Sequence, residues 1–262
     1  MLIEHEALRF NRTNCIFERI KSLTVTEEII DVYVNGDLYA TFHCLPSQIK
    51  ELVVGHLLTE GIIGDLKDLI ELKVTGKSVY VELPEKAFLD SIRRRRLITT
   101  FFGNSVIKPD LLEKASKLGF NKVRFSAETV FKAVEALNSI SPIYKASKGS
   151  HGALLIDEYC NIMSFAEDVS RHNAIDKVIG DAALRDIDLT KLLLASTGRL
   201  TSEIVVKASR VGIQVLVSLA APTSLGIKIA GNLGLTIIGF AGERYFHIYT
   251  FPERIRETEK GK

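Results

Sequence analysis

Short apolar runs alternate with helical segments from about residue 150 onward. The runs are four to six residues long and lack polar alternation, which is typical of strands buried on both faces. They are Ala153–Ile156, Leu192–Ala195, Gln214–Leu219 and Leu235–Gly239. The helical segments between them are His172–Leu184, Thr201–Val211 and Ser224–Asn232. This alternation predicts a layered α/β domain with an open sheet.

The N-terminal part is richer in strand patterns. Glu28–Val34 and Asp37–Cys44 are β-rich, and Asn35-Gly36 between them is a strong hairpin signal. A helix is predicted after Ser47, which is the expected N-cap, and Val74–Val79 indicates a second hairpin. We therefore expect a smaller β-rich α+β region.

The boundary between the two regions falls among helical patterns at Pro109–Leu118 and Ser126–Leu137. We place the N-terminal region at residues 1–115 and the C-terminal α/β domain, which would bind the ligand, at 116–262.

Composition favours a reduced, cytoplasmic protein. The three cysteines, Cys15, Cys44 and Cys160, form no C-x-x-C motif, so neither a disulfide framework nor a metal site is expected. The N-terminus lacks a signal-peptide pattern, and no long uncharged apolar stretch predicts a membrane span. The net charge of +2 gives no indication of a nucleic-acid partner.

The most polar of the predicted turns is the run Glu167–Lys177. Arg171 and His172 fall at the start of a predicted helix, where free backbone N–H groups and the helix dipole favour anions. The alternative is a well-capped helix with a solvated polar face.

Three more polar turns follow predicted strands. They contain Thr197-Gly198-Arg199, then Thr223, and then Gly242-Glu243-Arg244. In an open α/β sheet such turns line one edge, where ligands bind. Their arginines and the histidine predict an anionic, phosphorylated ligand, although neither a Walker nor a Rossmann glycine pattern is present. Taken alone, each turn also fits an ordinary strand-to-helix connection.

Several runs resemble the FdhD family of formate dehydrogenase accessory proteins. They are EDVSRHNAIDKVIG from Glu167, TGRLTSEIVVKA from Thr197, AAPTSL from Ala220, GHLLTEGII from Gly55, YTFPERI from Tyr249 and KGSHGA from Lys148. Together they span most of the chain from about residue 45 to 255.

The resemblance implies a cytidine-deaminase-like α/β sandwich that binds a molybdenum bis(molybdopterin guanine dinucleotide) cofactor or its tungsten equivalent. It also implies a homodimer, with the formate dehydrogenase catalytic subunit and a cysteine desulfurase as partners. The cofactor-binding residues that we expect are His151, Asp168, Arg171, His172, Asn173, Asp176, Lys177, Thr197, Gly198, Arg199, Thr223, Phe240, Ala241, Gly242, Glu243, Arg244 and Tyr245.

One loop departs from the family's pattern. The family carries sulfur as a persulfide on a C-x-x-C loop, whereas the matching segment here, Thr99–Ser105, reads TTFFGNS. Deaminase chemistry is not expected either, because His151-Gly152-Ala153 lacks the glutamate of the H-x-E motif. No catalytic residue is therefore assigned.

Three hypotheses remain open at this point. The chain is a cofactor-binding accessory protein, or a sulfurtransferase that uses Cys44, Cys160 or a partner's thiol, or a nucleotide-binding scaffold without chemistry.

We expect that the segment 99–105 carries no persulfide, because thiolate attack needs a cysteine and this segment has none. We also expect none on the three cysteines elsewhere in the chain, because free cysteines are more often small buried hydrophobic residues than reactive groups. The measurement is intact mass after incubation with a cysteine desulfurase and cysteine. A species heavier by one sulfur, lost on reduction and absent from a Cys44 or Cys160 variant, would contradict this and identify the carrier.

Overall fold

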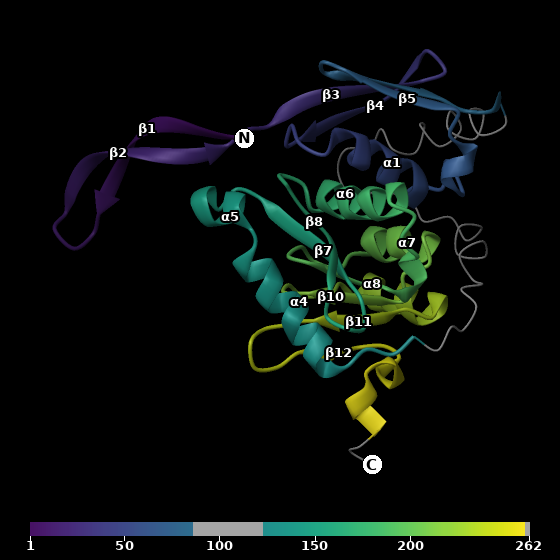
Figure 1. The fold of residues 1–262 in the computed structure, drawn as a ribbon. Coiled ribbons are helices and arrows are strands. Elements are labelled where there is room, and N and C mark those ends of the chain that lie inside the picture. Colours follow the sequence, from purple (N-terminus) through teal and green to yellow (C-terminus); the bar gives the residue numbers. More distant parts are fainter. Residues whose placement is uncertain (86–122, 260–262) are drawn as a thin grey trace.

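The structure, a computed structural model, describes residues 1–85 and 123–259 (Figure 1). A six-stranded sheet forms its centre, in the order β12-β11-β10-β9-β7-β8. Strands β9, β10 and β11 are parallel, and β7 runs antiparallel to both β8 and β9. The strand bounds are β7 His151–Ile156, β8 Ile162–Asp168, β9 Leu193–Ser196, β10 Val215–Ser218, β11 Thr236–Gly239 and β12 His247–Ile248.

Helices cover both faces of this sheet (Figure 1). On one face lie α6 (Arg171–Leu184), α7 (Ser202–Arg210) and α8 (Ser224–Leu233), which share an apolar core with the strands. On the other face lies α4 (Ala127–Ser139), which packs on β7 and β9. The short helix α5 (Pro142–Ser147) leads into β7. The predicted layered α/β architecture is confirmed.

The N-terminal β-rich region adds two further layers. Its four-stranded sheet has the order β4-β3-β6-β5 and packs on α1, which in turn packs on α6 (Figure 1). The bounds are β3 Glu28–Val34, β4 Asp37–Cys44, α1 Ile49–Thr59, β5 Glu71–Thr75 and β6 Ser78–Glu82. Single-turn 3-10 helices lie at Leu66–Asp68, Leu189–Lys191, Pro252–Arg254 and Arg256–Glu259.

Local signals gave the hairpin correctly and one helix cap wrongly. Asn35 and Gly36 both have positive φ, 48° and 85°, as a tight two-residue hairpin turn requires. The N-cap of α1 is Gln48 in a left-handed conformation, so the prediction of Ser47 is wrong. Ser224 is the first residue of α8, because the Thr223 hydroxyl caps the helix by accepting a hydrogen bond from Gly226 N.

A two-stranded ribbon precedes the rest of the chain. Strands β1 (Leu2–Asn11) and β2 (Ile16–Val25) pair along their full length and project away from the body (Figure 1). We call this ribbon the arm.

Some predictions lie outside the described residues. These are the helix Pro109–Leu118, the boundary between 115 and 116, and the altered loop 99–105. Within the residues that the structure does describe, no helix is long and apolar enough to cross a membrane.

Two glycines allow α1 and α6 to touch backbone to backbone. A Cβ on Gly55 would lie 1.8 Å from Asp176 O, and a Cβ on Gly180 would lie 1.9 Å from Glu51 O. Real Cβ atoms do not approach this closely, so only glycine fits at either position. The contact holds the N-terminal region against the helical layer of the large sheet.

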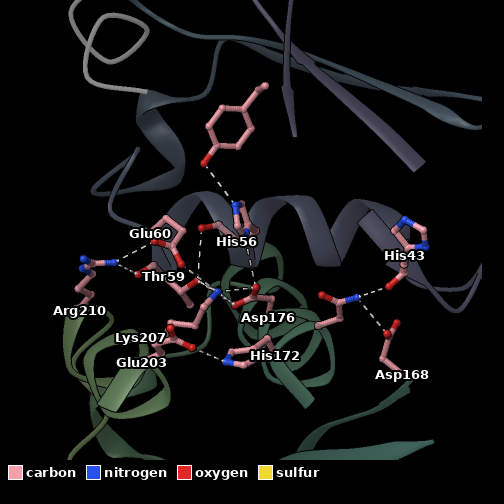
Figure 2. Close-up of polar contacts among 12 residues, drawn as sticks. His43, His56, Thr59, Glu60, Asp168, His172, Asp176, Glu203, Lys207 and Arg210 are labelled. Carbon is pink, nitrogen blue, oxygen red and sulfur yellow. Dashed lines mark hydrogen bonds and ion pairs between the residues drawn. The ribbon is translucent and has the colours of Figure 1, made fainter. Parts of the chain in front are cut away.

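Buried charges lie beside this glycine contact (Figure 2). Lys207 of α7 reaches between α1 and α6, and its Nζ lies 2.7 Å from Asp176 Oδ2 and 3.2 Å from Glu60 Oε1. Thr59 Oγ1 donates to Asp176 Oδ1 at 2.8 Å, and His56 Nδ1 lies 3.4 Å from Asp176 Oδ2. His56 and Asp176 thus come into contact although they are 120 positions apart in the chain.

The ionised form of Asp176 is favoured by these neighbours. Burial alone raises the pKa of this carboxyl group, but the opposite charge of Lys207 and the contact with His56 outweigh it and lower the pKa to about 2. Burial likewise lowers the pKa of Lys207, while Asp176 and Glu60 more than reverse this and raise it. The pair is therefore charged across the neutral range.

We predict that Gly180→Ala weakens the joint between α1 and α6. The new methyl group meets the Glu51 carbonyl, and overpacking of this kind costs about 1–3 kcal/mol or more. Gly231→Ala in α8 is the matched control, because a Cβ there meets no described atom within 4 Å. That substitution should stabilise by roughly 0.5–1 kcal/mol through helix propensity. Urea unfolding of both variants measures the difference, and equal effects would show that the contact is not tight.

We also predict that Asp176→Asn destabilises the protein most at neutral pH. Removing one partner of a buried ion pair leaves Lys207 poorly compensated and costs about 3 kcal/mol. Because the folded pKa of Asp176 is about 2, below its ordinary 3.8, its contribution is present above about pH 4 and is lost as the pH falls towards 2. Urea unfolding across this pH range should show the two proteins converging in acid.

Asp181→Asn is the control for this experiment, since Asp181 lies on the same helix in a solvent-exposed pair with Arg185. Its effect should stay below about 1 kcal/mol. If the difference in unfolding free energy between the wild type and Asp176→Asn did not change with pH, the lowered pKa assigned to Asp176 would be contradicted.

Candidate functional site

Several strand ends meet at one edge of the large sheet. The register pairs His151 with Asp168 and Ser196 with Ser218, so the start of β7 and the ends of β8, β9 and β10 lie side by side. Helices α6, α7 and α8 begin in the turns that follow these strand ends. The edge therefore gathers three helix N-termini, which favour anions. We call the residues gathered there the edge site, namely His151, Arg171, His172, Thr197, Gly198, Arg199 and Thr201.

The turn after β9 is fixed by short hydrogen bonds. Thr197 Oγ1 accepts from Gly152 N at 3.1 Å and lies 3.1 Å from His151 Nδ1. Gly198 O accepts from the Ser218 hydroxyl at 2.6 Å. A Cβ on Gly198 would lie 2.6 Å from Arg171 Cδ, so glycine is required for this turn to lie against Arg171. The turn and the start of α6 form one packed unit.

Three buried polar atoms at the edge site have no hydrogen-bond partner among the residues that the structure describes. They are Arg171 Nε, His172 Nε2 and Thr201 Oγ1. His172 Nε2 lies 3.3 Å from Glu203 Oε2, which is within ion-pair distance but outside hydrogen-bond geometry. Buried polar atoms without partners are rare in folded proteins. All three can donate a hydrogen bond, so an acceptor such as a phosphate oxygen would satisfy them.

The first turns of α6 and α7 at the edge site also lack side-chain caps. Neither Ser170, the N-cap of α6, nor Thr201, the N-cap of α7, caps its helix with its side chain. Thr201 was not predicted as a site residue, although a threonine directly before a predicted helix is a signal that could have found it.

Positive charge is concentrated at the edge site. Burial and the neighbouring charges of Arg171 and His172 lower the pKa of His151. Burial and the neighbouring charge of Arg199 lower the pKa of Arg171. Arg199 is thus close enough to disfavour the charge of Arg171, and an anion between the two side chains would relieve the repulsion.

The predicted segment Phe240–Tyr245 lies at the adjoining end of β11. Ala241 is buried and its N–H donates to Ser218 O at 3.0 Å, which ties the segment to the edge. Phe240 and Tyr245 are exposed, and their rings lie 5.4 Å and 5.7 Å from the ring of His247. Gly242 is partly buried, while Glu243 and Arg244 are exposed. Exposed flat rings of this kind favour stacking on another flat ring.

Asp168, Asn173 and Lys177 do not face the edge site. Lys177 and Asp168 are fully buried, with 2.7 Å between Nζ and Oδ2. Asp168 Oδ2 accepts from Leu45 N at 3.0 Å, and Asn173 Nδ2 donates to His43 O at 2.9 Å. These side chains hold the connection between β4 and α1, and their polar atoms are already used by protein groups.

Asp176 also lies away from the edge site, in the buried pair with Lys207. We expected Asp176 among the cofactor-binding residues, but its carboxylate instead contacts Lys207, Thr59 and His56. The reason is the geometry of α6. His172 and Asp176 lie on one row of the helix, but Asp176 is one turn further along, about 5.4 Å deeper into the protein.

None of the three cysteines adjoins the edge site. Cys44 is fully buried, and burial and the nearby charge of Asp168 raise the pKa of its thiol to about 12. Cys160 lies between β7 and β8 at the opposite edge of the sheet, about 17 Å away along β7. Cys15 lies at the tip of the arm. Over the described ranges, no three His, Cys, Asp or Glu side chains are grouped to hold a metal ion.

Known proteins resemble this chain along most of its length. Residues 25–256 match the FdhD/NarQ family. "Sulfur carrier protein FdhD" of Bacillus subtilis (strain 168) is 31% identical over 245 residues, covering 91% of this chain and 92% of that protein. The protein of the same name from Staphylococcus haemolyticus (strain JCSC1435) is 34% identical over 240 residues, covering 90% of each.

A solved structure shares the fold. The crystal structure of a putative formate dehydrogenase accessory protein from Desulfotalea psychrophila superposes with a TM-score of 0.80 at 23% identity, covering 97% of this chain and 99% of that one. With the fold, the family match and the relatives in agreement, the chain belongs to the FdhD/NarQ family.

Proposed function

We propose that this protein binds a molybdenum or tungsten bis-guanylyl-pterin cofactor at the edge site and serves formate dehydrogenase as an accessory protein. The observation that carries the proposal is a group of three buried donors, Arg171 Nε, His172 Nε2 and Thr201 Oγ1, without a hydrogen-bond partner among the described residues. Of these, His172 Nε2 lies within ion-pair distance of Glu203. The family supplies the kind of ligand, and this donor set fits the ligand's phosphate groups.

The edge site would bind phosphate through hydrogen-bond donors that are already held in place. The first turns of α6 and α7 have no side-chain cap, and the arginine guanidinium offers a planar fork that matches phosphate. Thr197 holds the ring of His151 through Nδ1, which leaves Nε2 of that ring for a ligand. These groups bind and orient an anion without any covalent step.

The exposed rings of Phe240 and Tyr245, next to the edge site, would hold a guanine or pterin ring. Phe240 and Tyr245 follow β11, which is two strands away from β9 in the sheet. Two inter-strand spacings amount to about 10 Å, which is comparable to the reach of a nucleotide from phosphate to base. A single nucleotide of the cofactor could therefore contact both the edge site and these two rings.

Cofactor binding accounts for the edge site better than sulfur transfer from this chain's own thiols does. The relatives are named sulfur carriers, but Cys44 is buried with a raised pKa, and Cys160 and Cys15 lie far from the edge site. A thiolate is needed for attack on sulfur. In this proposal any sulfur would reach the bound cofactor from a partner such as a cysteine desulfurase.

The implied partners follow from the same proposal. The protein would deliver the cofactor to the catalytic subunit of formate dehydrogenase in the cytoplasm, and would act as a homodimer. The bound cofactor is cargo, and its metal would supply the redox chemistry of the recipient enzyme.

We predict that GDP binds to the protein and that Arg171→Ala and Arg199→Ala each weaken binding by roughly tenfold or more. A charged hydrogen bond contributes about 1.5–3 kcal/mol, which corresponds to that change in affinity. Isothermal titration calorimetry gives the dissociation constants. Affinity should also fall at high salt, because charges at the partly exposed site are screened.

Arg256→Ala is the matched control, since Arg256 pairs with Glu158 near the C-terminus, away from the edge site. This variant should bind GDP as the wild type does. Equal affinity in all four proteins would refute the assignment of the phosphate site, and failure of wild-type protein to bind GDP would count against the proposed ligand.

A further inference from the structure

The four-stranded sheet has one covered face and one open face. Val32 and Val34 of β3 and Val79 and Val81 of β6 are buried in the apolar core that the sheet forms with α1. The alternate residues of these strands point the other way, because successive side chains of a strand lie on opposite faces. The sheet lies across α1 at the outside of the molecule, so its second face is turned away from the body (Figure 1).

Two tyrosines lie side by side on the open face. The parallel register pairs Tyr33 of β3 with Tyr80 of β6. Their rings stack, with 5.3 Å between the centroids and 15° between the planes. Tyr80 is 45% exposed. Tyrosine is enriched at protein interfaces, since its ring offers apolar area while its hydroxyl group stays in water.

Two carboxylates lie beside these rings in an unfavourable arrangement. Glu71 of β5 and Glu82 of β6 are exposed and directly opposite each other in the antiparallel register. Like charges in opposite positions of a sheet destabilise it. Within the described parts of the chain, neither carboxylate forms an ion pair. A cation placed between them would therefore be held by both.

The open face carries an excess of negative charge around the rings. Asp31 lies two residues before Tyr33 on the same face, and Lys73 lies opposite Tyr80. Three carboxylates thus face one ammonium group, and such a surface repels a nucleic acid or an anionic membrane. We call this surface the tyrosine face, namely Asp31, Tyr33, Glu71, Lys73, Tyr80 and Glu82.

We propose that the tyrosine face binds an arginine-bearing segment of another protein. A guanidinium group is planar, so it stacks on an aromatic ring and donates two parallel hydrogen bonds to a carboxylate. Glu82 lies two residues from Tyr80, which is about 7 Å along the strand. An arginine side chain over the ring of Tyr80 would reach that carboxylate with its guanidinium group. Lysine offers a point charge without the flat surface, so arginine suits this arrangement better.

The tyrosine face is separate from the edge site. It belongs to β3, β5 and β6, on the side of α1 that is turned away from α6 (Figure 1). The first turn of α6 supplies Arg171 and His172 to the edge site. A basic segment and an anionic ligand would therefore bind at different places, and this inference does not rest on the proposed cofactor.

The test uses the peptide acetyl-Arg-Gly-Arg-Gly-Arg-amide as the probe. It is titrated into the whole, isotope-labelled chain, and binding is followed by the chemical shifts of the backbone amides. The amides of β5 and β6 should shift, while those of β9 and β10 should not. The same peptide with lysine in place of arginine should bind roughly two- to fivefold more weakly, because it loses the stacking contact. Raising the salt concentration should weaken both peptides.

Variants assign the binding to particular side chains. Tyr80→Ala should weaken the arginine peptide roughly two- to fivefold, whereas Tyr80→Phe keeps the ring and should bind as the wild type does. Glu71→Gln with Glu82→Gln should weaken it roughly threefold or more. The matched controls are Tyr159→Ala and Glu135→Gln, which change an exposed tyrosine and an exposed carboxylate elsewhere and should leave the affinity unchanged.

Three results would overturn the proposal. One is the absence of amide shifts on the tyrosine face, and another is equal affinity for the arginine and lysine peptides, which would indicate a general attraction to positive charge. The third is a change in the mass of the protein in solution when Tyr80 is replaced by alanine, measured by sedimentation velocity. In that case the face would be a contact between copies of the chain rather than a site for a basic partner.

Discussion

The contact between α1 and α6 is the constraint on which the rest of this structure depends. Gly55 and Gly180 bring the two helix backbones together, and Lys207 joins them through Asp176 and Glu60. This backbone contact leaves no free space between the two helices, since protein interiors are packed as densely as organic crystals. It fixes α6 in depth and rotation, and the first turn of α6 supplies Arg171 and His172 to the edge site.

One run of eleven residues, Glu167–Lys177, therefore serves two purposes. Its first helical turn presents hydrogen-bond donors to the edge site, while its other polar residues already bond to groups elsewhere in the protein. Glu167 belongs to the second group, because its carboxylate accepts from Ile143 N, Tyr144 N and the Ser150 hydroxyl. Dense polar sequence is thus as much a sign of a buried interface as of a ligand site.

This division bears on how a family of sulfur carriers can include a chain without the C-x-x-C motif. The edge site uses helix starts, a glycine turn and arginine side chains, none of which depends on a thiol. Ligand binding and sulfur transfer are then separable physical tasks, and the binding that we propose at the edge site does not require the cysteines. The arm adds a third, separate feature, since it lies outside all three apolar cores.

The sequence by itself determined the elements with strong local causes. Asn35-Gly36 gave the hairpin because both residues tolerate positive φ, and uninterrupted apolar runs gave the central strands because burial on both faces leaves no room for polar residues. It also placed Arg171 and Arg199 at strand ends, which an open sheet gathers at one edge. Only the tertiary structure decided that Asp168 and Asp176 are buried, because their partners, Leu45 and Lys207 among them, lie 123 and 31 positions away. Periodicity describes which residues share a face, but what covers that face depends on contacts between segments distant in the chain.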